Sequence, residues 1–430
     1  MASHSTTPGA AADVFRVRGG TPLRGTVSLA GAKNSALKLM AASLLTDEPV
    51  ELEQIPAIAD VPVMAELLAG LGVEVALDSD AGTCRLRAAD PHFHAPAAAV
   101  RRIRASISCL GPLVGRVRRA RLALPGGDQI GARGIELHLQ GLTAMGASII
   151  DHGDELEIIA TDLHGAIITL DFPSVGATEN LLMAAVLADG TTVIDNAARE
   201  PEIQDLCRML VAMGANIQGI GAPTLEIEGV ERLTGVRWET CPDRIEAGTY
   251  AMAAALTGGD VVIERVRAQD LTMPLIKLRA AGVMVEEGGS SLRVKAAGLD
   301  AVDVVTLPYP GFPTDLQPQM MVLLTQAVGT SRCTENVFES RFSFVDQLRR
   351  MGADVQIDGH HAMIRGPVPL HGATLAGLDV RAGAAGAMAG LVADGETIIE
   401  DIHHIDRGYA DFVPRLQALG ADIERVRADA

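Results

Sequence analysis

Asp128 and Arg133 are the two charged side chains of a glycine-rich loop. The surrounding sequence, RLALPGGDQIGARGIELH from Arg121 to His138, predicts a short strand, a Pro-Gly-Gly turn and a loop that enters a helix near Gly134. The turn glycines allow a ligand to approach the backbone closely. A carboxyl group and a guanidinium five residues apart suit proton transfer beside an anion. An ordinary turn with a solvated salt bridge explains the same residues, so the interpretation depends on the rest of the chain.

Further charged and small polar residues stand where predicted strands lead into predicted helices. One group of helices begins at Lys33-Asn34, Arg104, Ser174-Val175-Gly176, Asp243-Arg244, Thr314-Asp315 and Arg381. A second group begins at Asp60, Asp128 with Arg133, Glu200 and Glu202, Asp270, Glu339 with Arg341, and Asp406-Arg407. Helix N-termini bind anions through free N–H groups and the positive end of the helix dipole. Helix capping explains Asp60 and Asp270. Arginine at an N-terminus opposes the dipole, so the arginines predict a cationic cleft.

A helix-ending pattern that recurs six times shows how these residues are positioned. Each copy has apolar helical residues, then a glycine, then a short predicted strand. The glycines are Gly72, Gly146, Gly214, Gly282, Gly352 and Gly420, at spacings of 68 to 74 residues. Glycine at a helix C-terminus adopts the left-handed conformation at little steric cost. The repeat predicts six supersecondary units of about seventy residues each.

Each unit is predicted to have the order βαβαββ. In the first unit the predicted strands are 24–30, 49–54, 73–77 and 84–87, and the predicted helices are 34–45 and 61–71. The helices are apolar around most of their circumference, so we expect them to be buried.

The two ends of the chain complete one another in this scheme. The sixth unit lacks its final strand, whereas the predicted strand 14–18 has no unit of its own. We therefore expect the N-terminal strand to complete the sixth unit, with three units in each of two domains. The predicted domains are residues 33–242, which are continuous, and residues 13–32 with 243–430, which are discontinuous.

Composition excludes several classes of function. The chain has 430 residues, 48% of them hydrophobic, which is enough for two substantial cores. A net charge of −18 argues against nucleic acid or an anionic membrane as a partner. The five cysteines show neither paired nor metal-ligand spacing, which favours a reducing cytoplasm. We expect no membrane span, and a disordered tail over the first dozen residues.

Ten motifs then identify a family. In order, the chain contains GAKNSALKLMAASLL, RASISCLGPLVGR, LPGGDQIGAR, FPSVGAT, NAAREPEI, PDRIEAGT, FPTDLQPQ, ENVFESRF, LDVRAG and HIDRGY. Essentially the whole chain beyond Val14 resembles the UDP-N-acetylglucosamine 1-carboxyvinyltransferase family of enolpyruvyl transferases. The resemblance implies an α/β fold of two inside-out domains, each with three βαβαββ units, in agreement with the repeat. The related shikimate-pathway transferase would show a GSKS-type first motif where this chain has GAKN.

The resemblance also implies a reaction. The enolpyruvyl group of phosphoenolpyruvate would move to the 3-hydroxyl of UDP-N-acetylglucosamine with release of phosphate, the step that opens peptidoglycan synthesis. Neither a cofactor nor a metal ion is expected. Asp128 matches the general acid and Asp315 the base that faces the hydroxyl, although a helix cap is an alternative for Asp315.

The remaining site residues are also carried by the resemblance. Lys33, Arg133 and Arg407 match the phosphate-binding positions, and Arg341 and Arg381 match those that address the carboxylate. The implied catalytic set is Asp128, Asp315, Lys33 and Arg407. Further implied substrate-binding residues are Asn34, Asp379 and Val337; Arg104 with Ser174, Val175 and Gly176 for the diphosphate; and Arg133, Gly134, Ile135, Glu136, Leu137 and His138 for uracil and ribose. A satisfied surface histidine is an alternative for His138.

Three positions depart from the family pattern. Asp128 stands where many members have the cysteine that fosfomycin attacks, which predicts resistance to fosfomycin. Gly134 stands where proline is frequent, and Ser108 where tryptophan is frequent. Because the last two lie near the nucleotide pocket, two alternatives stay open: a paralogue acting on UMP or another uridine nucleotide in secondary metabolism, and a catalytically silent ligand-binding paralogue.

Overall fold

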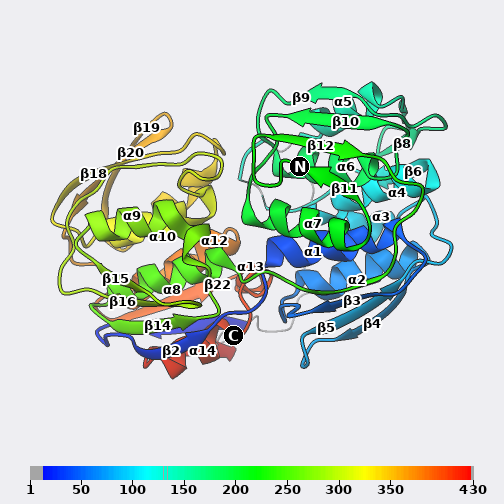
Figure 1. Cartoon of the computed structure of the whole chain (residues 1–430). Helices are drawn as coiled ribbons and strands as arrows, with labels where there is room; N and C mark the ends of the chain where they lie inside the picture. Colours follow the sequence, from blue (N-terminus) through cyan, green and yellow to red (C-terminus); the bar gives the residue numbers. More distant parts are fainter. Residues whose placement is uncertain (1–12, 129, 133, 428–430) are drawn as a thin grey trace.

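The computed structural model describes residues 13–128, 130–132 and 134–427. Its buried hydrophobic residues form two separate clusters, seen as two lobes in Figure 1. The first cluster draws on residues 36–233 together with Ala410, and the second on residues 15–29 and 245–423. We call the corresponding parts the first and the second lobe. The clusters support the predicted domain division, which we retain as a proposal.

Both lobes place short sheets around central helices. The helices of the first lobe are α1 (Lys33–Ala42), α2 (Asp60–Gly70), α3 (Ala97–Val100), α4 (Leu110–Val117), α5 (Glu136–Ala144), α6 (Val175–Ala185) and α7 (Pro201–Ala212), with a 3₁₀ turn at Arg104–Cys109. Its strands are β3 (Val50–Glu53), β4 (Glu74–Asp78), β5 (Thr83–Arg87), β6 (Arg119–Ala123), β7 (Ser148–Asp151), β8 (Glu155–Ile159), β9 (Ile167–Thr169), β10 (Thr191–Asp195), β11 (Asn216–Gln218), β12 (Thr224–Glu228) and β13 (Val236–Glu239). They form sheets in the orders β13-β3-β5-β4, β6-β8-β7 and β11-β12-β10-β9.

The second lobe repeats this plan. Its helices are α8 (Arg244–Leu256), α9 (Thr272–Ala280), α10 (Gln317–Leu324), α11 (Val345–Arg350), α12 (Val380–Gly390), α13 (His403–Asp406) and α14 (Phe412–Ala418), with 3₁₀ turns at Ala268–Leu271, Thr314–Leu316 and Arg341–Phe344. Its strands are β1 (Asp13–Arg18), β2 (Arg24–Ser28), β14 (Asp260–Glu264), β15 (Met284–Glu287), β16 (Ser291–Lys295), β17 (Val304–Val305), β18 (Gly329–Thr334), β19 (Asp354–Asp358), β20 (His361–Gly366), β21 (Thr374–Ala376), β22 (Glu396–Glu400) and β23 (Asp422–Arg427). The sheet orders are β15-β16-β14-β2, β17-β18-β20-β19 and β21-β22-β1-β23.

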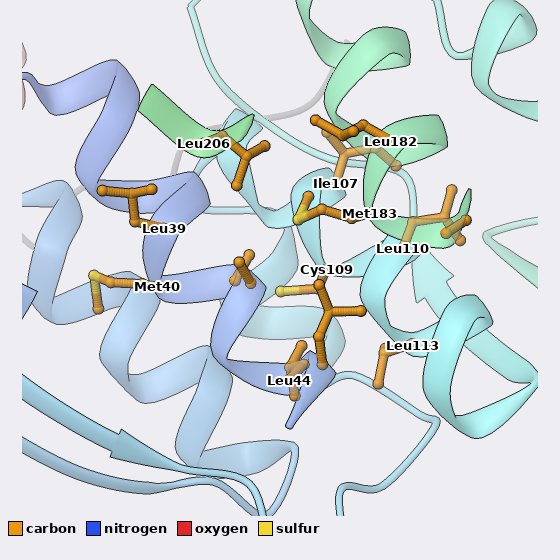
Figure 2. Packing of buried hydrophobic residues seen from close by; sticks show 14 of the residues in the cluster. Leu39, Met40, Leu44, Ile107, Cys109, Leu110, Leu113, Leu182, Met183 and Leu206 are labelled. Atoms are coloured by element: carbon orange, nitrogen blue, oxygen red, sulfur yellow. The ribbon is translucent and has the colours of Figure 1, made fainter. Parts of the chain in front are cut away.

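The central helices are buried on all sides, as their sequences predict. Every residue of α8 and of α12 is buried. Figure 2 shows side chains of α1, α4 and α6, among them Met40, Leu113 and Leu182, packed together in the first lobe. Small residues allow the close helix contacts: a Cβ on Gly111 would lie 2.2 Å from the carbonyl oxygen of Asn180 on the neighbouring helix α6.

The six repeated glycines end six helices. All of them have positive φ values, between 85° and 107°, in the left-handed region that favours glycine. The predicted repeat is therefore confirmed, and so is the α/β fold of strand–helix units.

The N-terminal strand completes the last sheet, as predicted. Strand β1 lies between β22 and β23 and is antiparallel to both. The repeat scheme is wrong in one part: residues 24–30 do not open the first unit, because β2 pairs with β14 of the second lobe, where the predicted domain boundaries place it. Its place beside β3 is taken by β13. Local sequence patterns predict strands but do not specify which sheet edge each strand joins.

The chain crosses between the lobes at two adjacent segments. The backbone N–H of Ala32 donates to the carbonyl oxygen of Cys241 at 2.7 Å, and the N–H of Asp243 donates to that of Ala30 at 3.2 Å. Asp243 also caps α8 by accepting from the N–H groups of Ile245 and Glu246. Its other carboxylate oxygen accepts from the N–H of Lys33, so one side chain joins the starts of α8 and α1.

Across residues 13–128, 130–132 and 134–427, no helix has the length and apolar character needed to span a membrane.

Candidate active site

A cleft of about 550 Å³ lies between the two lobes, and both lobes supply its walls. Six central elements begin at this cleft. They contribute Lys33 of α1, Arg104 before α4, Ser174 before α6, Arg244 of α8, Asp315 before α10, and Arg381 of α12. The helix starts that the repeat predicted therefore meet at a single cavity.

Most of the predicted site residues line this cleft. They are Lys33, Asn34, Arg104, Asp128, Gly134, Glu136, Leu137, His138, Ser174, Val175, Gly176, Asp315, Val337, Arg341, Arg381 and Arg407. Ile135 is buried in the first core, and Asp379 is buried beside Arg341. Arg133 lies outside the described residues.

Arg407 joins the lobes at one end of the cleft. Its Nε is 2.8 Å from Oδ1 of Asp60, and its Nη1 is 2.6 Å from Oδ1 of Asp128. Lys33 Nζ is 2.8 Å from Oδ2 of the same Asp60. A cap role was a sufficient explanation of Asp60 in the sequence, but its carboxylate instead holds two cations of the cleft.

Burial and charge oppose each other in this group. Burial lowers the pKa of the Lys33 ammonium, and Asp60 opposes that effect. Burial would raise the pKa of Asp60, but the charges of Lys33 and Arg407 outweigh it and lower that pKa. Asp60 is therefore ionised and keeps two cations close together, so an incoming anion meets both at once.

The Asp128 loop is fixed by tight backbone contacts. Gly127 has φ +114°, and a Cβ on Gly126 would lie 1.8 Å from the carbonyl oxygen of Arg101. Both glycines are therefore required where the sequence predicted a tight turn. The Asp128 side chain keeps 17% of its surface exposed, at the boundary between the lobes.

Asp315 lies between two arginines in the second lobe. Its Oδ1 is 2.6 Å from Nη2 of Arg341, and its Oδ2 is 3.0 Å from Nη2 of Arg381. Burial would raise the pKa of Asp315, but the two guanidinium charges outweigh it and hold the pKa well below its usual range. Asp315 is therefore ionised.

Asp379 positions one of these arginines. It is the N-cap of α12 and accepts from the N–H groups of Arg381 and Ala382. The cap fixes the first turn of the helix from which the Arg381 side chain reaches the cleft.

Another part of the cleft wall combines helix starts with a buried histidine. Ser174 caps α6 by accepting from the N–H of Ala177. Arg104 donates to the carbonyl oxygen of Gly134 at 3.3 Å. His138 is buried rather than on the surface, its Nδ1 lies 3.0 Å from Nδ2 of Asn180, and burial and Arg104 lower its pKa to about 4. It is therefore a neutral part of the cleft wall.

A buried polar group of three residues also lines this part of the cleft, and the motifs did not reveal it. Nζ of Lys38 is 2.6 Å from Oε2 of Glu179, and Oγ of Ser108 donates to the Oε1 at 2.5 Å. All three are buried and line the cleft. A signal existed: Lys38 is one of four lysines in the chain, and Glu179 is a single acid in an apolar helix, where a charge needs a partner.

A second pair of acids lies at the start of α7. Glu202 binds Arg244 of the second lobe through two contacts, at 3.0 and 3.3 Å. Glu200 lines the cleft beside it, and its Oε1 is 3.5 Å from the backbone nitrogen of Tyr309. The helix-start pattern predicted that these residues lie at the cleft, although it assigned them no role.

Known proteins with similar sequences are named as carboxyvinyltransferases. The family described as EPSP synthase (3-phosphoshikimate 1-carboxyvinyltransferase) matches residues 17–416. UDP-N-acetylglucosamine 1-carboxyvinyltransferase of Corynebacterium jeikeium is 53% identical over 96% of this chain and 99% of that protein. The protein of the same name from Mycobacterium tuberculosis is 52% identical over 96% and 99%.

Solved structures agree with the sequence relatives. The enolpyruvyl transferase NikO from Streptomyces tendae has a TM-score of 0.89 at 26% identity, covering 97% of this chain and 100% of that one. EPSP synthase from Acinetobacter baumannii shares the fold, with a TM-score of 0.75 at 18% identity over 96% of this chain and 100% of that one.

Proposed function

The chain belongs to the EPSP synthase family of enolpyruvyl transferases, and we propose that it transfers the enolpyruvyl group of phosphoenolpyruvate to the 3-hydroxyl of UDP-N-acetylglucosamine, releasing phosphate. The observation that carries this choice of acceptor is identity of 50–53% over nearly the full chain to relatives named for that reaction. The reaction is the first committed step of peptidoglycan synthesis. The five buried free cysteines support a reducing, cytoplasmic location.

The cleft has two cationic groups that suit the two ends of phosphoenolpyruvate. Lys33 and Arg407, held together by Asp60, suit the phosphate. Arg341 and Arg381, which share Asp315, suit the carboxylate because an arginine fork matches a planar oxyanion. Phosphoenolpyruvate bound in this way places its methylene carbon between the two groups, on the side of Asp128.

In the addition step the two acids exchange protons with the substrates. Asp128 gives a proton to the methylene carbon, the 3-hydroxyl oxygen bonds to the neighbouring carbon of phosphoenolpyruvate, and Asp315 takes the hydroxyl proton. A carboxylate of the substrate competes with Asp315 for Arg341 and Arg381, which makes Asp315 a better base. A phosphate takes over the Arg407 contact and leaves the Asp128 carboxyl free to carry its proton.

In the elimination step Asp128 regains a proton and Asp315 gives one up, each with a different substrate atom from the one used in the addition step. The bond between carbon and the phosphate oxygen breaks, and Asp128 takes a proton from the new methyl group. Asp315 returns its proton to the departing phosphate. Both acids end in their initial states, and the hydroxyl proton leaves on phosphate.

The sugar nucleotide is proposed to bind along the first lobe. Arg104 and the start of α6 at Ser174 suit the diphosphate. The segment from Gly134 to His138 lines the same end of the cleft and suits uracil and ribose. Buried Ser108, bonded to Glu179, stands there in place of a larger side chain.

A phosphate-release assay with phosphoenolpyruvate tests the assignment. UDP-N-acetylglucosamine, UMP and shikimate 3-phosphate are offered separately, and we expect release with the first. Release with UMP alone would identify the uridine-nucleotide paralogue. If no acceptor supports release while UDP-N-acetylglucosamine binds by calorimetry, the protein is a ligand-binding paralogue and the proposed reaction is wrong.

A further inference from the structure

Glu200 differs from the acids around it because one of its carboxylate oxygens lacks a partner. Asp60, Asp128, Glu179, Glu202 and Asp315 each contact at least one cation of the cleft. Glu200 instead lies near the charge of Arg244, and its Oε1 receives a long contact from the backbone nitrogen of Tyr309. Among the described residues, its Oε2 is buried and has no hydrogen-bond partner. A buried acceptor without a donor is costly, so such an oxygen points to a ligand group that completes it.

Glu200 does not serve the helix that it begins. It is the N-cap of α7 but no bond from its side chain caps the helix in the described structure. Its side chain instead turns to the cleft. Burial raises the pKa of Glu200, as expected for a buried carboxylate with few hydrogen-bond donors around it.

Arg244 places Glu200 next to the proposed reaction centre. Burial lowers the pKa of Arg244, but the charges of Glu202, Glu200 and Asp315 outweigh that effect and raise it. Glu200 and Asp315 therefore both lie within electrostatic reach of one guanidinium. If Asp315 faces the 3-hydroxyl of the sugar, the substituents on the adjacent carbons 2 and 4 lie in the part of the cleft that Asp315 and Glu200 both line, and the chemistry of the wall beside Glu200 decides between them.

The wall beside Glu200 is apolar. Leu307, Pro308 and Tyr309 form this part of the cleft, and Leu307 is 47% exposed. A group that suits the corner has a hydrogen-bond donor for Glu200 and a small apolar part for this wall. An acetamido group has both, in its N–H and its methyl.

We propose that Glu200, together with the Leu307–Tyr309 wall, binds the acetamido group on carbon 2 of the acceptor sugar and selects for it. This subsite rests on the proposed function, because the sugar is placed by its 3-hydroxyl at Asp315. Glu200 accepts the amide N–H, and the methyl packs on the apolar wall. Glu200 is thus a specificity-determining residue outside the set that the motifs implied.

The test compares UDP-N-acetylglucosamine with UDP-2-deoxyglucose, which lacks the whole substituent. Dissociation constants by calorimetry and kcat/KM are measured for the wild type, Glu200→Gln and Glu200→Leu. The preference for the acetamido sugar should fall about ten- to a hundredfold in Glu200→Leu, the value of a hydrogen bond to a charged group. Glu200→Gln keeps a carbonyl acceptor and should retain part of the preference.

Glu202→Gln is the matched control. Glu202 adjoins Glu200 but is paired with Arg244, so its loss should weaken both nucleotides alike and leave their ratio unchanged. An unchanged ratio of the two dissociation constants in Glu200→Leu, whether or not both nucleotides bind more weakly, would overturn the subsite.

The same measurements distinguish failure of the proposed function from failure of the Glu200 subsite. Wild-type binding without phosphate release, with the preference still lost in Glu200→Leu, would refute the reaction and keep the subsite. Phosphate release with UDP-N-acetylglucosamine, together with an unchanged preference in Glu200→Leu, would keep the reaction and refute the subsite. Wild-type protein that does not bind UDP-N-acetylglucosamine would overturn both.

Discussion

By the resemblance, Asp128 stands where many family members have a cysteine, and a carboxyl group in place of a thiol has a chemical consequence. A thiolate is a soft nucleophile that opens an epoxide, whereas a carboxylate is a weaker nucleophile toward the same carbon. Cys109, the nearest cysteine in the sequence, is fully buried, and burial raises its pKa to about 12. It is therefore an inert part of the core.

We predict that the wild type keeps its activity during prolonged incubation with fosfomycin. Asp128→Cys should stay active, because a thiol is also a proton donor, and should lose activity with time in the drug. Phosphate release and intact-mass spectrometry follow both. Cys109→Ser in the wild type is the control and should change nothing. A covalent adduct on wild-type Asp128 or Cys109 would contradict this reading of the loop.

Arg407 bridges Asp60 and Asp128 across the cleft, so its loss tests the anion site. Arg407→Ala should lower kcat by about a hundredfold or more, the usual cost of removing one group that stabilises transition-state charge. The fold should survive, because Asp60 keeps its contact with Lys33. Arg293→Ala removes an exposed pair with Asp260 and should leave turnover unchanged. Loss of the folded state in Arg407→Ala, measured by urea unfolding, would make Arg407 a structural residue.

At the residue scale, much of the site follows from the sequence. Each charged residue at a predicted helix start could be named because strand-to-helix junctions are local. The contact partner of each charged residue was harder to predict, because partners can be far apart in the chain. Asp60 and Arg407, for example, are 347 residues apart in sequence. Glu200 shows the same limit, because the sequence places it at the cleft and only the three-dimensional packing leaves its Oε2 unpartnered.

Among the elements, α8 carries the clearest pH dependence. Glu246 lies in its first turn, with Oε1 2.6 Å from Nη1 of Arg415 and Oε2 accepting from the N–H of Ala30. Burial raises the pKa of Glu246 to about 7, although Arg415 opposes this; Asp243 raises it further. The same helix carries Tyr250, and burial raises the pKa of that side chain as well.

The sign follows from proton linkage. The folded protein holds the Glu246 proton at pH values where the unfolded chain has released it, so stability falls as the pH rises from about 4.5 to about 7. The slope is at most about 1.4 kcal/mol per pH unit. Glu246→Gln should lack this contribution, and urea unfolding between pH 5 and pH 8 measures the difference. Exposed Glu264→Gln on β14 is the control. Identical pH profiles for wild type and Glu246→Gln would contradict the assignment.

Elements were predictable wherever the pattern repeats. Six glycines with positive φ mark six helix ends. The pairing of the N-terminal strand with the last sheet could be predicted because the sixth unit lacked its final strand. The repeat scheme assigned residues 24–30 to the first unit, whereas β2 pairs with β14 and β13 takes the place beside β3. Both are short, alternating strands, and the sheet that each joins is set by the path of the chain through the two crossing segments rather than by strand composition.

At the scale of the whole molecule, an acidic protein surrounds a cationic cleft. The net charge is −18, yet Lys33, Arg104, Arg244, Arg341, Arg381 and Arg407 all face one cavity. Local cationic charge between low-dielectric walls attracts anions despite the overall sign. Anionic substrates would therefore bind between the lobes and hold them together.

The last prediction concerns closure of the lobes. Arg407 with Asp60 and Asp128, and Arg244 with Glu202, cross the cleft, whereas the chain itself crosses only at the adjacent segments near Ala32 and Cys241. Such a connection suits a hinge. The proposed sugar nucleotide contacts Arg104 of the first lobe through its diphosphate and Asp315 of the second through its 3-hydroxyl, so its binding should favour the closed state.

Small-angle X-ray scattering can measure this closure. Without substrate we expect a larger radius of gyration, and with UDP-N-acetylglucosamine a decrease toward about 22 Å, the value for a compact chain of this length. Glu202→Gln removes one contact across the cleft, so it should need more nucleotide to reach the same compaction. UMP, which lacks the sugar proposed to reach Asp315, should compact the protein less at saturation. A radius of gyration that stays constant in all these titrations would show that the site is preassembled and that substrate does not drive closure.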